Sequence, residues 1–296
     1  MYGGSGFVGT RVLRTALASG MRVASVSRNG PPAALDSSLS EVEWIRADVE
    51  DPPALARSLE GADAVVSCIG AFGSNDFMRR INGDANASIV EAAAAAGVGR
   101  LAYISAATFR PVELVIPGYF EGKRIAEEAV TRHYGPAGAV LRPPAVYGTR
   151  DVGKYVKIPL GLIGVPLGSL FASAPMRSLA NALGPLGDLM MPWVSVDDVA
   201  AAAVAHVLQS DDSGNGGGGS GRGGEATTDG SAGAAVVLDW KAIVGASSSL
   251  FSGLPPQATL FWDGGCPLCK TEIAYYKRID VAQRVEWVDI YSHPER

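Results

Sequence analysis

The chain contains little cysteine, little charge and no excess of basic residues. Among its 296 residues there are three cysteines, and 19% of the residues are charged, with a formal net charge of −5 at pH 7. Three cysteines are too few for the disulfide framework of a secreted protein, which favours a reducing compartment or a redox role for the close pair Cys266 and Cys269. The negative net charge argues against a nucleic-acid partner. No signal or transit peptide is visible in the sequence.

One long segment lacks charge altogether. Residues 158–176 contain no Asp, Glu, Lys or Arg, but Pro159, Pro166 and Pro175 interrupt the run. These prolines argue against a continuous membrane-spanning helix. We therefore expect the segment to face a substrate pocket or a partner, with peripheral contact at a membrane surface as the alternative.

The most informative motif is the run YGGSGFVG at residues 2–9. Gly3, Gly6 and Gly9 have the spacing G-x-x-G-x-x-G, and an apolar pattern of helical period follows at residues 10–19. In a dinucleotide cradle the first glycine permits a tight turn, the second lets the backbone approach a pyrophosphate, and the third lets the helix pack on the sheet. A buried strand should precede these glycines. Only two residues do, so we expect this sequence to lack its native N-terminus and the first strand.

Strand and helix patterns alternate after the glycines, which predicts a doubly wound parallel Rossmann sheet of the α/β class, here without its first strand. The expected strands are residues 22–27, 42–45, 64–69 and 100–105, and the expected helices between and after them are residues 52–59, 82–96 and 122–134.

Composition divides the second half of the chain. Residues 211–233 are glycine, serine and acidic residues with almost nothing apolar, which predicts a flexible solvated insertion. The pattern at residues 236–243 indicates a strand and the start of a helix that return to the first domain. We therefore predict a first domain at residues 1–248, a linker at residues 249–257 and a second domain at residues 258–296.

Tyr119 and Lys123 form a Y-x-x-x-K pair at the start of a predicted helix. This spacing places the phenol and the ammonium on one helix face. The lysine would lower the phenol pKa and hold the nicotinamide ribose, so that the tyrosine exchanges a proton with a carbonyl or an alcohol during hydride transfer. A surface pair without function is the alternative for this spacing alone.

The order of several motifs favours the catalytic interpretation. The glycine run comes first, then Asp48 and Val49 after one strand, Ile69 and Gly70 after the next, then Tyr119 and Lys123, and finally the run LRPPAVYG at residues 141–148. In this order the motifs resemble the extended and atypical short-chain dehydrogenase/reductases, a likeness that covers roughly residues 2–248.

Within that family the chain is most similar to one branch, through the runs GGSGFVG, ASVSRNG, RINGDAN, GYFEGKR and LRPPAVYG. The branch contains the NADPH-binding accessory subunit of respiratory complex I, a fungal reductase-like protein associated with coenzyme Q synthesis, and plastoglobule proteins. The resemblance implies a mitochondrial or plastid location, a small-molecule quinone or carbonyl substrate, and an organellar protein complex as a further partner.

The resemblance also implies where a cofactor binds, and NADP(H) is expected in preference to NAD(H). Ser27 and Arg28 end the second strand, where an acidic residue would hold the ribose 2′-hydroxyl of NAD and where a serine and an arginine suit the 2′-phosphate of NADP. A solvated surface charge is the alternative for Arg28. The other expected cofactor contacts are Gly3, Gly6, Phe7, Val8, Gly9, Asp48, Val49, Ile69, Gly70 and Lys123.

Catalysis in this family also needs a hydroxyl that polarises the carbonyl. Ser105 is the first candidate for this role beside Tyr119 and Lys123, and Thr108 is the second. The branch includes proteins in which the nucleotide is structural. A non-catalytic scaffold stabilised by NADPH is therefore the alternative to an NADP-dependent reductase.

A second redox motif lies near the end of the chain. Cys266 and Cys269 follow a predicted strand at residues 259–262 and open a predicted helix. The positive end of a helix stabilises a thiolate, which makes Cys266 the attacking sulfur and Cys269 the resolving one. A zinc site and an inert structural pair are the alternatives. No second ligand pair follows, so no metal site is expected.

The run FWDGGCPLC, with a helix and a strand at residues 285–290 after it, is similar to the DCC family of thiol-disulfide oxidoreductases. Asp263, Cys266 and Cys269 match its signature over roughly 38 residues, a β-α-β fragment of a thioredoxin-like fold, so we expect the sequence to be truncated at this end too. The resemblance implies disulfide exchange with protein thiols. Direct electron flow from NADPH to this pair is not expected, because nicotinamides normally reduce disulfides through a flavin and no flavin motif is evident.

Overall fold

The computed structural model describes most of the first half of the chain and parts of the second. The described residues are 1–33, 36–108, 110–152, 156–159, 193–209, 234–251, 258–262, 285–289 and 291–292, together with Lys270, Ile273 and Lys277.

The central sheet is parallel and confirms the predicted doubly wound α/β fold. β1 (Ala24–Ser27) pairs with β2 (Glu43–Arg46), and β3 (Ala64–Ser67), β4 (Arg100–Ile104), β5 (Gly138–Leu141) and β10 (Val236–Leu238) pair in that order. Ala102 in β4 lies opposite Val66 on one side and Ala139 on the other. β3, β4 and β5 are almost wholly buried, as parallel strands covered on both faces require.

Met1 and Tyr2 occupy the position between β1 and β3. Tyr2 forms parallel bridges to Val26 and Ser67, which join the two sets of strands into one sheet. Toward the N-terminal ends of the strands, a cavity of about 1110 Å³ opens behind Tyr2 between β1 and β3. The expected first strand is thus represented by two residues.

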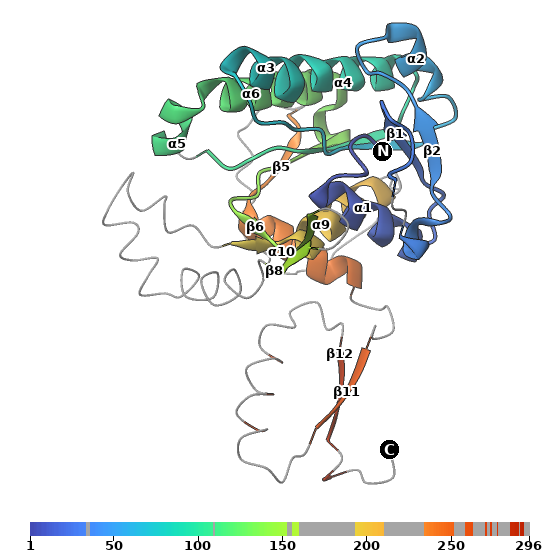
Figure 1. Ribbon diagram of the computed structural model, residues 1–296, viewed down its shortest axis with the longest axis vertical. Helices are drawn as coiled ribbons and strands as arrows, with labels where there is room; N and C mark the ends of the chain where they lie inside the picture. Colours follow the sequence, from blue (N-terminus) through green and yellow to red (C-terminus); the bar gives the residue numbers. More distant parts are fainter. Residues whose placement is uncertain are drawn as a thin grey trace, which may run out of the picture.

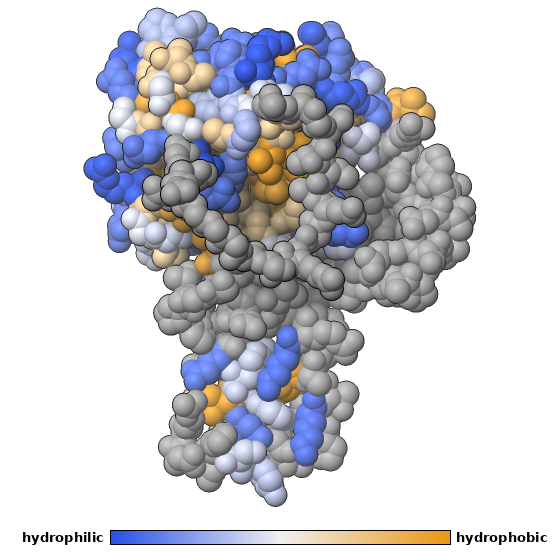
Figure 2. Space-filling view, turned by 180° about the vertical axis from the view of Figure 1, so that it is seen from behind, coloured by the Kyte–Doolittle hydropathy of each residue, from blue (hydrophilic) through white to orange (hydrophobic). Residues whose placement is uncertain are grey.

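Helices cover both faces of the sheet (Figure 1). One face carries α2 (Pro52–Arg57), α3 (Asn75–Arg79), α4 (Ala85–Ala95) and α6 (Pro117–Tyr134), and the other carries α1 (Phe7–Ala18), α9 (Val196–Leu208) and α10 (Trp240–Phe251). Polar side chains cover much of the outer surface of this domain in Figure 2.

Alternation along β4 separates the two halves of the core. Leu101 and Tyr103 lie in the cluster with α4 and α6, whereas Ala102 and Ile104 lie in the cluster with α1, α9 and α10. Successive side chains of a strand point to opposite faces, so one strand supplies both clusters.

Two expected helices begin at different residues. The helix expected at residues 82–96 begins as α4 at Ala85, because a π-helix, Arg80–Asp84, separates it from α3. The helix expected at residues 122–134 is α6, which begins at Pro117, a residue that favours the first helical turn. A short helix, α5 (Arg110–Val115), precedes it.

Smaller strand pairs follow α6. β6 (Val146–Tyr147) pairs with β9 (Val194–Ser195), and β7 (Thr149–Val152) pairs with β8 (Val156–Pro159). Most of the uncharged run at residues 158–176 lies outside the described residues. Within the described part of the chain, no helix combines the length and hydropathy needed to cross a membrane.

The second half of the chain returns to the sheet, as the sequence predicts, because β10 pairs with β5 and leads into α10. That helix extends to Phe251, so it occupies the first part of the range expected to be a linker. The glycine-rich range 211–233 lies outside the described residues.

The C-terminal piece contains a parallel strand pair. β11 (Ala258–Trp262) pairs with β12 (Val285–Asp289), and Lys277 lies 5.0 Å from the centre of the Trp262 ring. Ile273, between the strands in sequence, is helical and buried. This confirms the predicted β-α-β order. Asp263, Cys266 and Cys269 lie outside the described residues.

Candidate active site and nucleotide-binding loop

The glycine loop joins Tyr2 to α1 in a conformation that depends on glycine. Gly3 has a φ of +78°, in the left-handed region, so a side chain there would be strained. A Cβ at Gly9 would lie 2.1 Å from the Gly3 carbonyl oxygen. The third glycine therefore lets α1 pack on the loop itself, rather than on the sheet as expected from the motif.

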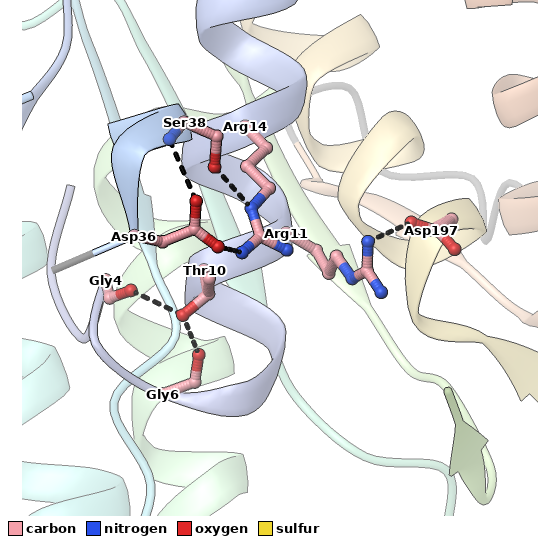
Figure 3. Close-up of polar contacts among 8 residues, drawn as sticks. All are labelled: Gly4, Gly6, Thr10, Arg11, Arg14, Asp36, Ser38 and Asp197. Atoms are coloured by element: carbon pink, nitrogen blue, oxygen red, sulfur yellow. Dashed lines mark hydrogen bonds and ion pairs between the residues drawn. The ribbon is translucent and has the colours of Figure 1, made fainter. Parts of the chain in front are cut away.

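The first turn of α1 leaves its backbone N–H groups available. The N-cap residue Gly6 has no side chain, and no acidic residue lies in the first turn. Thr10 donates its hydroxyl proton to the carbonyls of Gly4 (3.2 Å) and Gly6 (2.8 Å), which tightens the loop (Figure 3). Free N–H groups at the positive end of a helix bind phosphate groups. The loop with Phe7 and Val8 therefore fits a pyrophosphate.

Two arginines of α1 hold that helix in place (Figure 3). Arg14 pairs with Asp36 at 2.6 Å, and Arg11 lies 3.6 Å from Asp197 at the start of α9. Hydrogen bonds from Ser38, and then the Arg14 charge, lower the pKa of the Asp36 carboxyl. Both guanidinium groups thus face carboxylates, so a phosphate at the start of α1 would contact backbone N–H groups and not these arginines.

Ser27 and Arg28 lie at the C-terminal end of β1. The Ser27 hydroxyl donates to the Gly30 carbonyl at 2.7 Å, which fixes the turn, and Arg28 is exposed. Arg46, at the end of β2, donates from its Nε to the Arg28 carbonyl at 3.1 Å. The structure thus places a second arginine beside Arg28. Sequence analysis missed Arg46, although its place at the end of the neighbouring strand was a signal.

Asp48 and Val49 follow β2. Asp48 is exposed and accepts a hydrogen bond from the backbone N–H of Glu50 at 3.1 Å, whereas Val49 packs against the core. Their roles as cofactor contacts stay predictions.

The loop after β3 lies against Lys123. A Cβ at Gly70 would lie 3.2 Å from Asn82 Oδ1 and 3.8 Å from Lys123 Nζ, while Ile69 packs against the core. The Asn82 side chain accepts from the Ala71 N–H (3.1 Å) and donates to the Ala71 carbonyl (2.9 Å). Asn82 belongs to the π-helix, so that irregular turn fixes the loop beside the lysine.

Lys123 is buried at the centre of this site. Its Nζ donates to the Ile104 carbonyl at 2.8 Å and lies 4.8 Å from the centre of the Tyr103 ring. Burial lowers the pKa of the Lys123 ammonium to about 8, partly opposed by Cys68 and Glu127.

Tyr119 lies one helical turn before Lys123. Its ring stacks on Phe72, with ring centres 5.0 Å apart and an interplanar angle of 6°. Lys123 Nζ is 5.7 Å from the centre of the Tyr119 ring. Burial raises the pKa of the Tyr119 phenol, so the expected lowering by the lysine is wrong here. The cause is desolvation of the phenol, while the ammonium donates to the Ile104 carbonyl.

Ser105 is buried, and its hydroxyl donates to the Glu127 carboxylate. Arg142 Nε also donates to Glu127, at 3.0 Å, and this bond raises the pKa of the guanidinium. Ser105 was expected to donate its hydroxyl proton to a substrate carbonyl, but it donates to Glu127 instead. Thr108, the second candidate, is exposed. Sequence analysis missed Glu127 and Arg142. Glu127 lies four residues after Lys123 on the same helix, which was the available signal.

Among the described residues, no group of three His, Cys, Asp or Glu side chains is placed to hold a metal ion.

The lowered pKa of Lys123 predicts how activity depends on pH. In the role that the sequence predicts for Lys123, the protonated ammonium donates to ribose hydroxyls, so kcat/KM should stay level below pH 7 and fall by about tenfold per unit well above the pKa of about 8. A pH series of initial rates measures this. Lys123→Met should be slow throughout and lack this fall, and a wild-type profile that is level to pH 10 would contradict the prediction.

Comparison with protein families gives two matches. Residues 3–159 match the model of the family described as NAD(P)H-binding. Residues 260–296 match the family described as DCC1-like thiol-disulfide oxidoreductase.

Several curated proteins resemble the chain. An uncharacterized chloroplastic protein of Arabidopsis thaliana is 41% identical over 218 residues, which cover 71% of each chain. A ceramide reductase of Caulobacter vibrioides is 32% identical over 205 residues, covering 69% of this chain and 58% of that protein. A mitochondrial protein of Neurospora crassa, fmp-52, is 30% identical over 164 residues, covering 52% of this chain and 67% of that one.

Solved structures share the fold. MoeE5 in complex with UDP-glucuronic acid and NAD superimposes with a TM-score of 0.51 at 17% identity, over 81% of this chain and 75% of that one.

Proposed function

The chain belongs to the NAD(P)H-binding family, and from this membership we propose that it is an NADPH-dependent reductase of a small carbonyl or quinone substrate. The observation that carries the proposal is the placement of buried Lys123 between Gly70 and Tyr119. These residues follow β3 or lie at the start of α6, at the edge of the sheet where the glycine loop also lies. Ligands of open α/β sheets bind at this carboxyl edge of the strands.

Each residue has a distinct task in the proposed reaction. The glycine loop and the first turn of α1 would bind the pyrophosphate, and Lys123 would donate to the ribose hydroxyls. NADPH, when bound, supplies the hydride that reduces the carbonyl carbon and leaves as NADP+. The Tyr119 phenol gives its proton to the carbonyl oxygen, which yields an alcohol, and solvent restores that proton. The raised pKa of Tyr119 keeps the phenol protonated at neutral pH, as a proton donor requires.

The arginines at the ends of β1 and β2 support a preference for NADPH. Arg28 is exposed, and Arg46 is held beside it through the Arg28 carbonyl. Counted with the strand position of Tyr2 as the first, β1 and β2 are the second and third strands of a dinucleotide fold, and two guanidinium groups at their ends suit the 2′-phosphate of NADPH. Ser27 stands where a carboxylate would select NADH.

Nucleotide titration tests this preference. Arg28→Ala should raise the Kd of NADPH by about 10- to 100-fold, the value of a hydrogen bond between charged groups, and leave the Kd of NADH nearly unchanged. Arg22→Ala is the matched control, since Arg22 is exposed before β1, at the other end of the strand. Tighter binding of NADH than NADPH by the wild-type chain would contradict the preference, and binding of neither would overturn the reductase proposal.

The relatives support an organellar place for this activity. One is named as chloroplastic and another as mitochondrial, and we propose that the chain acts in quinone or redox metabolism of such an organelle, in contact with an organellar protein complex or the membrane surface. Localisation of the tagged chain in cell fractions tests this statement.

The C-terminal piece adds a second proposed activity, dithiol exchange with protein thiols. The match to the thiol-disulfide oxidoreductase family over residues 260–296 supports it, together with the spacing of Cys266 and Cys269. In the exchange, the Cys266 thiolate attacks a substrate disulfide, and Cys269 then displaces the substrate thiol, so the pair is oxidised as the substrate is reduced. Loss of disulfide reduction in Cys266→Ser, with NADPH binding unchanged, is the expected result.

A further inference from the structure

The most exposed large hydrophobic side chains of the described residues lie on two segments of the molecule. Leu114 is 86% exposed, Val115 is 75% exposed and Phe72 is 74% exposed. Phe72 lies in the loop after β3, and Leu114 and Val115 end α5. Isolated exposed hydrophobic residues are common, so the placement of these three residues relative to the site decides whether they form one surface.

These segments flank Tyr119. Phe72 stacks on the Tyr119 ring at 5.0 Å, and Val115 is separated from Tyr119 by only three residues. Figure 1 shows α5 at the left end of α6, where α6 begins, and hydrophobic side chains stand out at the corresponding upper right corner of Figure 2. We call Phe72, Leu114 and Val115 the apolar lip.

Polar contacts hold both sides of the lip in position. Glu113 pairs with Arg124 of α6, so the charged side chain of α5 next to Leu114 is neutralised. The backbone N–H of Gly118 donates to Asn75 Oδ1 at 3.2 Å, and this bond ties the start of α6 to the segment after Phe72. A Cβ at Gly118 would lie 2.2 Å from the Asn75 carbonyl oxygen, so the close approach depends on glycine. The exposure of the lip is therefore built into an anchored surface.

We propose that the apolar lip binds the hydrocarbon chain of the substrate, so that the preferred substrate is a ketone with an extended alkyl chain whose carbonyl lies at the Tyr119 hydroxyl. This inference rests on the proposed reductase function and names its substrate class. Burial of apolar surface would supply the binding energy, because the lip offers no charge to a polar tail. The stacked Phe72 ring extends the apolar surface beside the phenol.

A series of unbranched methyl ketones from acetone to decan-2-one tests the proposal. With NADPH and the full chain, kcat/KM should increase by about two- to fourfold for each methylene that the lip buries. The double variant Leu114→Ser with Val115→Ser should lower the ratio of kcat/KM for decan-2-one to that for acetone by about tenfold. Both residues are highly exposed, so the substitutions should leave the fold intact, which circular dichroism checks.

Leu208→Ser is the matched control. Leu208 is 41% exposed at the C-terminal end of α9, and its neighbours Val207 and Gln209 line the cavity at the opposite edge of the sheet. This variant should keep the wild-type ratio. The proposal would be overturned if the wild type had similar kcat/KM values for decan-2-one and acetone. It would also be overturned if the ratio of these two values were the same in the double variant as in the wild type.

Binding separates this inference from the reductase proposal. Calorimetric titration of decan-2-one into NADPH-loaded Tyr119→Phe protein needs no turnover. One outcome is that the wild-type chain reduces none of the ketones while decan-2-one still binds to Tyr119→Phe protein through Leu114 and Val115. In that case the reductase proposal fails and the lip stands as an alkyl-binding surface. Equal affinities of the double variant and its parent for decan-2-one would refute the lip.

Discussion

Tyr119→Phe is expected to lower kcat by about 100- to 10,000-fold while NADPH binds with unchanged affinity. The substitution removes only the hydroxyl, and the phenylalanine ring keeps the stacking on Phe72. Without the phenol the carbonyl oxygen must take its proton from water, which is poorly placed to give it. Single-turnover oxidation of NADPH, followed by absorbance, measures the chemical step apart from product release.

Tyr103→Phe is the matched control for this loss. It also removes a buried phenol close to Lys123, but that hydroxyl donates to the Asn82 carbonyl at 3.0 Å and has no role in proton transfer. Its kcat should stay within about tenfold of the wild type. Unchanged cellular function in Tyr119→Phe would favour the other interpretation, a scaffold stabilised by NADPH.

Arg142→Met should destabilise the first domain by about 1–2 kcal/mol, less than the loss of a fully buried ion pair, because the Arg142 side chain is 41% exposed and its charge is screened by solvent. The Glu127 side chain is 11% exposed and would keep the Ser105 hydroxyl as its hydrogen-bond donor after the guanidinium is lost. For a domain of this size, the loss should lower the Tm by about 2–8 °C. Thermal unfolding monitored by circular dichroism at neutral pH measures it.

A compensating change tests the cause of that loss. Adding Glu127→Gln to Arg142→Met removes the unpaired buried charge, so the double variant should regain about half of the lost stability. If the double variant is as unstable as the sum of both single variants, the pair does not act as a unit, and the destabilisation comes from lost packing of the arginine stem.

Glu127 also shows why part of the site escaped sequence analysis. Glycine spacing and the order of strands and helices are local properties, and they predicted the cradle, the sheet and the return of β10 to β5. The contact of Ser105 with Glu127 joins residues 22 positions apart. A serine after a strand gives the same sequence pattern whether its hydroxyl faces a substrate or a carboxylate.

The electrostatics of the catalytic pair needed the structure for the same reason. The spacing of Tyr119 and Lys123 correctly placed both on α6, but it predicted a lowered phenol pKa. Burial raises the phenol pKa and lowers the lysine pKa instead, because desolvation disfavours the charged form of each group. Desolvation depends on every neighbour in space, and the decisive neighbours come from β3, β4 and the loop after β3.

The sequence by itself determined the fold class, the nucleotide loop and the redox motif near the C-terminus, because each depends on residue types at short fixed spacings. Tertiary structure alone decided which groups carry protons at the site, which arginine accompanies Arg28, and that an apolar lip flanks Tyr119. These properties arise where loops from separate strands meet at one edge of the sheet. The chain topology creates that meeting, and no local pattern encodes its distances or its burial.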